Sequence, residues 1–210
     1  MSLPDFLIIG AMKSGSTWLH DILTSHSEIE MPVDRKETHY FTRYYDRGID
    51  WYESKFPHNT SKLIGETTPS YLSAKACPSR IAELLPEVKL ICILRNPADR
   101  AFSHYNFLKR ETNMSQTFWE LAEIAPDILK NGLYFTHLER YSHYFKMENV
   151  KVIIFERMLK NKEATMREIC EFLKISYDFD FELLHDKSNV SKKPRFHLIY
   201  AATKKKLCPL

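Results

Sequence analysis

Short runs of apolar residues, separated by polar segments, recur along the chain. The runs at 6–9 (FLII), 88–94 (VKLICIL) and 150–155 (VKVIIF) are apolar nearly throughout, and a shorter run lies at 62–66 (KLIGE). Continuous apolar runs of this length are typical of strands that are buried on both faces of a parallel sheet. The pattern therefore predicts four strands of one mainly parallel sheet.

Segments with apolar residues at helical spacing lie between and after these runs. The predicted helices span residues 17–25, 74–85, 97 to about 111, 137–146 and 162–173. Strands that alternate with helices indicate an α/β fold, with the sheet as the middle layer of a three-layer sandwich. The sequence contains no internal repeat and no linker, so we expect one domain over residues 1–210.

Composition narrows the classes of function. The chain has 210 residues, 44% of them hydrophobic and 27% charged, which suits a globular domain with a full core. There are only five glycines and no G-x-G-x-x-G, so the fingerprint of a dinucleotide-binding site is absent. A formal charge of +3 is too small to indicate nucleic acid as a partner. The composition does not exclude a smaller anionic ligand.

The cysteines and the apolar runs bear on the compartment. Cys77, Cys92, Cys170 and Cys208 show no C-x-x-C spacing, so we expect reduced thiols, and no metal site is indicated. No apolar stretch is long enough for a membrane span or the apolar part of a signal peptide. We expect a cytoplasmic protein, unless the chain is an excised catalytic domain.

A glycine-containing loop carries the strongest chemical signal. Residues 10–17 (GAMKSGST) follow a predicted strand and open a predicted helix, and such a turn directs backbone N–H groups at an anion. A Walker A loop has lysine directly after its second glycine, but this chain has Ser16 there, and its only loop lysine is Lys13. The strand at 88–94 leads into Arg95, not into an aspartate that could hold Mg²⁺. These differences disfavour an NTPase that positions Mg²⁺ against a triphosphate. The alternative is a plain strand-to-helix turn with polar residues at the surface.

Five blocks of sequence resemble the sulfotransferases that use 3′-phosphoadenosine 5′-phosphosulfate (PAPS). The blocks are 6–19 (FLIIGAMKSGSTWL), 36–41 (KETHYF), 48–57 (GIDWYESKFP), 65–72 (GETTPSYL) and 90–105 (LICILRNPADRAFSHY). They follow the family's order over roughly the first half of the chain, and the likeness is greatest to glycosaminoglycan-type and bacterial members, including heparan sulfate sulfotransferase domains. The resemblance implies a P-loop-like fold and transfer of a sulfuryl group to a hydroxyl or amine. It also implies the product 3′-phosphoadenosine 5′-phosphate (PAP) and no metal.

The resemblance also assigns residues to the donor. It implies that Lys13 offsets charge on the leaving phosphate, as positioning and charge are most of the catalysis in such transfers. The residues implied to bind the 5′-phosphosulfate end are Lys13, Ser14, Gly15, Ser16, Thr17 and Trp18. The residues implied to bind the 3′-phosphate or adenine are Arg95, Ser103, Lys192, Lys193 and Arg195. The last three also fit a solvated basic run, and Arg100 is expected to be structural.

On the acceptor side, the resemblance points to Glu37 as general base and to His39 as its orienting partner or a substitute base. Thr67 and Tyr71 are expected to contact the acceptor. Thr67 stands where the heparan sulfate enzymes commonly have lysine, and this weakens the case for a highly sulfated polysaccharide. The acceptor is expected to be a carbohydrate or a small molecule, and nothing in the sequence indicates the oligomeric state. Histidines elsewhere, such as His20, are expected to have no chemical role.

Other interpretations remain open from the sequence. A nucleoside or small-molecule kinase would need Mg²⁺ and ATP, and Ser16 argues against it. A nucleotide-binding module without turnover is the other alternative. Two features support it: Thr67 replaces a lysine, and the resemblance implies that family members continue past the point that corresponds to Leu210. We therefore expect a C-terminal segment that is shortened or truncated.

Overall fold

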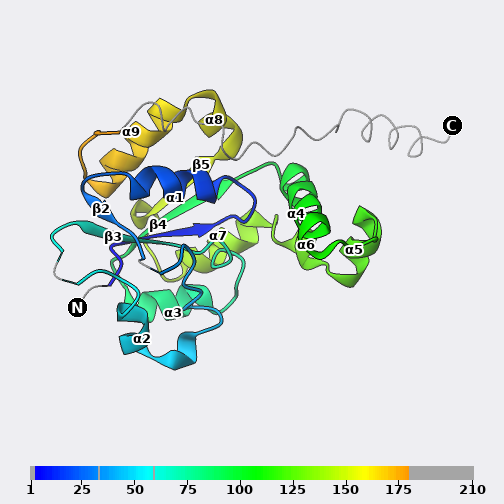
Figure 1. Ribbon diagram of the computed structural model, residues 1–210, viewed down its shortest axis with the longest axis horizontal. Coiled ribbons are helices and arrows are strands. Elements are labelled where there is room, and N and C mark those ends of the chain that lie inside the picture. The colour runs from blue at the N-terminus through cyan, green and yellow to red at the C-terminus, as the bar shows by residue number, and fades with distance from the viewer. Residues whose placement is uncertain (1–2, 33, 59, 180–210) are drawn as a thin grey trace.

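The computed structural model describes residues 3–32, 34–58 and 60–179, and a five-stranded sheet runs through them (Figure 1). The strands are β1 (Phe6–Gly10), β2 (Ile29–Glu30), β3 (Leu63–Thr67), β4 (Lys89–Leu94) and β5 (Val150–Ile154). They lie in the order β2-β3-β1-β4-β5, and every neighbouring pair is parallel. The predicted α/β fold with a central parallel sheet is confirmed, with β2 as an additional strand that the apolar pattern did not predict.

Helices cover both faces of the sheet (Figure 1). One face carries α1 (Ser16–Thr24), α8 (Phe155–Lys160) and α9 (Lys162–Leu173). The opposite face carries α2 (Ile49–Glu53), α3 (Cys77–Leu84) and α7 (Tyr134–Ser142). Beside the sheet lie α4 (Pro97–Thr112), α5 (Phe118–Ile124) and α6 (Asp127–Lys130). Two short 3₁₀ turns, η1 (Tyr45–Arg47) and η2 (Met147–Asn149), complete the elements of the described residues.

The central strands are apolar throughout because successive side chains enter two different cores. Phe6 and Ile8 of β1 pack with the helices of one face, while Leu7 and Ile9 pack with those of the other. A strand with one solvent-facing side would instead alternate between apolar and polar residues. This double burial is the physical reason why the apolar runs predicted strands.

Gly65 permits close packing between two neighbouring strands. It is the register partner of Phe6, and a Cβ atom at this position would overlap the Phe6 ring and lie 2.7 Å from the sulfur of Met31. No side chain fits there without moving the core. The sequence alone had given this glycine no role.

The predicted long helices are present, with shifted ends. The segment predicted as a helix over 74–85 is helical from Cys77 to Leu84, and the one predicted over 137–146 is α7, which begins at Tyr134. The short helices α2, α5, α6 and α8 were not predicted. Cys77, Cys92 and Cys170 are buried free thiols, as expected, and Cys208 lies outside the described residues. In the described part of the chain, no helix combines the length and apolar character needed to cross a membrane.

Parallel strands bring their carboxyl ends to one edge of the sheet. β1 ends at Gly10, β3 at Thr67 and β4 at Leu94, and these three strands are neighbours. In open α/β sheets, ligands bind beyond this edge. The loop after β1, with Lys13, and the end of β4, with Arg95, therefore meet at this edge.

Candidate active site

The loop between β1 and α1 has the conformation that the sequence pattern indicated. Gly15 is the N-cap of α1 and has φ of +93°, a left-handed conformation that favours glycine. A Cβ atom on Gly15 would also lie 2.9 Å from the ring of Phe155 and 3.0 Å from Met158 Cε. The loop can therefore turn tightly into the helix, whose free N–H groups face an incoming anion. Ser14 and Ser16 are buried within it.

Lys13 places a positive charge beside this loop. Its ammonium lies 4.0 Å from the ring centre of Phe107 on α4 and forms no ion pair with any described residue. Burial is the main cause that lowers the pKa of Lys13, followed by the positive charges of Arg110 and Lys36. A cation in such surroundings is stabilised when an anion binds next to it.

Arg95 lies at the end of β4 and turns back to the same loop. Its Nη1 donates a hydrogen bond to the carbonyl oxygen of Lys13 at 3.1 Å, and its guanidinium lies 4.9 Å from the ring centre of Phe155. The structure thus joins Lys13 and Arg95, which are far apart in the sequence. Ser103 lies on α4, is partly buried and forms no hydrogen bond with Arg95 here.

Two further residues of this region had been assigned from the sequence. Trp18 lies on α1, partly buried, with the ammonium of Lys162 5.4 Å from its ring centre. Arg100 is fully buried in α4 and donates a hydrogen bond to the carbonyl oxygen of Ile128 in α6. This contact joins two helices, which confirms the structural role expected for Arg100.

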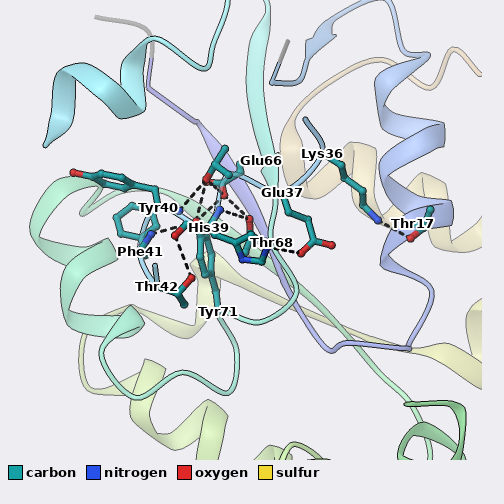
Figure 2. Close-up of polar contacts among 11 residues, drawn as sticks. Thr17, Lys36, Glu37, His39, Tyr40, Phe41, Thr42, Glu66, Thr68 and Tyr71 are labelled. Atoms are coloured by element: carbon teal, nitrogen blue, oxygen red, sulfur yellow. Dashed lines mark hydrogen bonds and ion pairs between the residues drawn. The ribbon is translucent and has the colours of Figure 1, made fainter. Parts of the chain in front are cut away.

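Glu37 and His39 face each other on the segment that follows β2 (Figure 2). The distance from His39 Nε2 to Glu37 Oε2 is 3.3 Å, and the side chains are 24% and 36% exposed for His39 and Glu37. Burial is the largest cause that lowers the pKa of His39, and the charge of Glu37 acts against it. The pair leaves a carboxylate that is oriented by one partner and still open to solvent.

Directly behind this pair lies Glu66 of β3, a residue that the sequence analysis did not select. Its carboxylate is fully buried and accepts hydrogen bonds from four hydroxyl groups. Figure 2 shows it with two of these donors, Thr68 and Tyr71. The donors are Thr38 at 2.6 Å, Thr68 at 2.7 Å, Tyr71 at 2.7 Å, and Tyr52. Because Thr38 stands between Glu37 and His39 in the chain, the network fixes the position of the pair.

Thr67 and Tyr71 are both buried, unlike residues that meet a substrate directly. Thr67 Oγ1 lies 3.1 Å from Nδ1 of His20 on α1, and the Tyr71 hydroxyl is engaged with Glu66. Their predicted contact with an acceptor stays a prediction without support in this geometry. The contact of His20 was not anticipated from the sequence.

Lys36 was likewise not selected from the sequence. Its Nζ donates a hydrogen bond to Thr17 Oγ1 at 2.5 Å, which links the Glu37 segment to the first turn of α1 (Figure 2). The two ends of this contact are too far apart in sequence for a local motif to reveal it. A clue was present only in the position of Lys36 next to Glu37.

Some predicted features cannot be placed. Lys192, Lys193 and Arg195 lie outside the described residues. Among residues 3–32, 34–58 and 60–179, no group of three His, Cys, Asp or Glu side chains is arranged to hold a metal ion.

Comparison with known proteins gives concordant matches. A family model described as "Sulfotransferase domain" matches residues 3–208. "Bifunctional heparan sulfate N-deacetylase/N-sulfotransferase 1" of Xenopus laevis is 32% identical over 85% of this chain and 23% of its own length. Human "Heparan sulfate glucosamine 3-O-sulfotransferase 6" is 31% identical over 81% of this chain and 52% of its own. The chain thus spans about a quarter to a half of the length of these two relatives.

The fold has a close counterpart among solved structures. The crystal structure of a sulfotransferase from Alicyclobacillus acidocaldarius superimposes with a TM-score of 0.78 at 27% sequence identity. The superposition covers 98% of this chain and 92% of the other.

Proposed function

The chain belongs to the sulfotransferase domain family, and on that premise we propose that it transfers a sulfuryl group from PAPS to a hydroxyl or amine of an acceptor. One observation carries the proposal. Two cations without an ion pair in the described residues, Lys13 and Arg95, meet at a helix N-terminus on the same sheet edge as an oriented carboxylate, Glu37. Cations at one side and a base at the other suit an anionic donor and a protic acceptor.

The donor half of the site fits a nucleotide with several anionic groups. The left-handed Gly15, the N–H groups of α1, and the charges of Lys13 and Arg95 are of the kind that bind phosphate and sulfate. Residues 13–18 are proposed to hold the 5′-phosphosulfate end, and Arg95 with Ser103 the 3′-phosphate; Lys192, Lys193 and Arg195 are proposed to cover it. PAPS supplies the activated sulfuryl group when bound.

The acceptor half supplies the base. Glu37 accepts the proton that the acceptor hydroxyl or amine loses as its oxygen or nitrogen bonds to sulfur, and His39, whose Nε2 lies 3.3 Å from the carboxylate, holds it in position. Lys13 offsets the negative charge that remains on the phosphate oxygen when its bond to sulfur breaks. Electrostatic stabilisation of this kind needs no covalent intermediate with the protein.

We propose a carbohydrate or a small molecule as the acceptor. Two of the similar proteins are heparan sulfate enzymes by name, which supports a carbohydrate. The neutral Thr67, held by His20, supports an acceptor with less negative charge than a highly sulfated polysaccharide.

Titration calorimetry with PAP tests the donor site. We expect metal-independent binding that weakens at least about tenfold in Lys13→Ala and in Arg95→Ala, because losing one hydrogen bond to a charged group costs about 1.5–3 kcal/mol. Lys146→Ala is the control, as Lys146 is 81% exposed and pairs with Glu148. Unchanged binding in both site variants would overturn the assignment, and Mg²⁺-dependent ATP binding in place of PAP binding would favour a kinase.

Transfer of labelled sulfate from PAPS to a panel of hydroxyl and amine acceptors, read by mass gain, tests the reaction. Glu37→Gln should lower kcat by roughly 100-fold or more, a usual share for general base catalysis, and leave the Kd for PAP unchanged. His39→Asn should have a smaller effect, because Glu37 keeps its carboxylate. PAP binding without transfer to any acceptor would favour the module without turnover.

A further inference from the structure

Lys36 connects the two halves of the site. It precedes Glu37 in the chain, and its side chain crosses to α1, where Nζ donates to Thr17 Oγ1 at 2.5 Å (Figure 2). Thr17 belongs to the anion-binding loop. The ammonium of Lys36 therefore lies between the proposed donor loop and the proposed base.

The charge of Lys36 has no close counter-ion in the described part of the chain. No carboxylate oxygen forms an ion pair with it, although Glu37 and Asp21 exert a weaker attraction. Burial is the main cause that lowers the pKa of Lys36, and its charge in turn lowers the pKa of Lys13. Two partly buried lysines that repel each other are both stabilised when an anion binds near them.

The third side chain near this point carries no charge at neutral pH. Burial and the charge of Lys36 lower the pKa of His20 to about 4, and its Nδ1 is occupied by Thr67. Near Thr17, Lys36 therefore carries a positive charge whereas His20 does not. Lys36 comes from the acceptor segment, whereas Lys13 and Arg95 come from the donor side of the sheet edge.

We propose that Lys36 is a catalytic residue that binds the oxygens of the sulfuryl group during its transfer. This inference rests on the proposed function. The sulfuryl group must pass from a phosphate oxygen near Lys13 to an acceptor atom near Glu37, and Lys36 lies along that path. Its ammonium offsets the charge on the three sulfuryl oxygens, while Thr17 keeps it aimed at them.

The difference between PAPS and PAP isolates this role, because PAP lacks the sulfuryl group. In Lys36→Met, we expect the Kd for PAP to stay within about twofold of the wild-type value and kcat to fall by roughly 100-fold, which is typical for loss of one charge-stabilising donor. Lys36→Arg keeps the charge and should recover most of that loss. Lys62→Met is the matched control, since Lys62 pairs with Glu30 at the opposite end of β3.

A double-mutant comparison tests whether Lys36 contacts the sulfuryl group itself or only positions the Thr17 side chain. If Lys36 only positioned Thr17, Lys36→Met would cost nothing further in a Thr17→Val background. We expect a further loss of at least about tenfold in kcat in that background. Thermal melting shows which variants fold, and Lys36→Gln gives the same comparison if the methionine variant does not.

The outcomes are distinguishable. A kcat within twofold of wild type in Lys36→Met, or a PAP affinity that falls as much as kcat, would overturn this inference and leave the proposed function intact. A wild-type protein that binds no PAP, or transfers no sulfate, would overturn the proposed function and this inference with it.

Discussion

At the scale of single residues, Glu66 determines the shape of the acceptor side. Its buried carboxylate accepts hydroxyl hydrogen bonds from Thr38 between Glu37 and His39, from Thr68 just after β3, and from Tyr52 of α2. Burial and then the negative charge of Glu66 raise the pKa of Tyr52 and of Tyr71 well above the ordinary value, so both stay donors. A buried carboxylate without a cation is tolerated only when its hydrogen bonds are complete.

Glu66→Gln tests this network. The amide keeps one acceptor oxygen but turns N–H groups toward hydroxyl donors, and we expect about 1–3 kcal/mol less stability in urea unfolding. We also expect a lower kcat at unchanged PAP affinity, because the Glu37 segment loses its fixed position. Glu83→Gln is the control, since Glu83 accepts a hydrogen bond from Tyr45 at an exposed position and should change stability by less than about 0.5 kcal/mol. Equal stability of the two variants would contradict the role of Glu66.

Some residues of the candidate site could be selected from the sequence alone, and others could not. Lys13, Gly15 and Arg95 could be selected from the sequence as candidates because each lies in a contiguous block near a strand end. Glu66, Lys36 and His20 could not be, because their contacts join positions 28, 19 and 47 residues apart. A polar side chain in an apolar strand, as Glu66 is in β3, is the one signal that a closer inspection could have used.

At the scale of elements, burial on two faces made the strands predictable. The predicted strands agree with β1, β3, β4 and β5 to within a residue or two at their ends. β2 has only two residues and shows no apolar run, so pairing with β3, not composition, makes it a strand.

Among the helices, α5 shows a signal that the apolar pattern does not contain. Its N-terminus has a capping box, in which Thr117 accepts from the backbone of Glu120 and Glu120 accepts from the backbone of Thr117. This T-x-x-E spacing is visible in the sequence. The helix itself has few buried residues, so hydrophobic periodicity could not indicate it. The helical group α4–α6 instead packs through its own small core around Tyr105 and Ile128.

At the scale of the whole molecule, the parallel sheet turns separate sequence blocks into one site. The strand order places β1 between β3 and β4, so the loops after these three strands meet. The formal charge of +3 gave no sign of the local excess of positive charge around Lys13, because carboxylates elsewhere balance it. Order along the sequence predicted the fold, whereas the side-chain pairs within the site arise only from the folded arrangement.

The folded molecule should also lose stability on mild acidification. Burial, the largest cause, lowers the pKa of His20 and of His104 from 6.5 to about 4. Between these two values, the unfolded chain binds more protons than the folded chain, so the free energy of unfolding falls as the pH drops from about 6.5 toward about 4. Near His104, the positive charges of Arg100 and Lys13 oppose protonation further.

Thermal melting at pH 7.5 and pH 5.0 measures this effect. We expect the melting temperature to fall further from pH 7.5 to pH 5.0 in the wild type than in His104→Asn. The reason is that the variant has one buried imidazole fewer to protonate on unfolding. His143→Asn is the matched control at an exposed helix end, and it should keep the wild-type pH dependence. An equal loss in His104→Asn and the wild type would show that His104 does not couple folding to pH, and the lower stability in acid would then have to come from other groups.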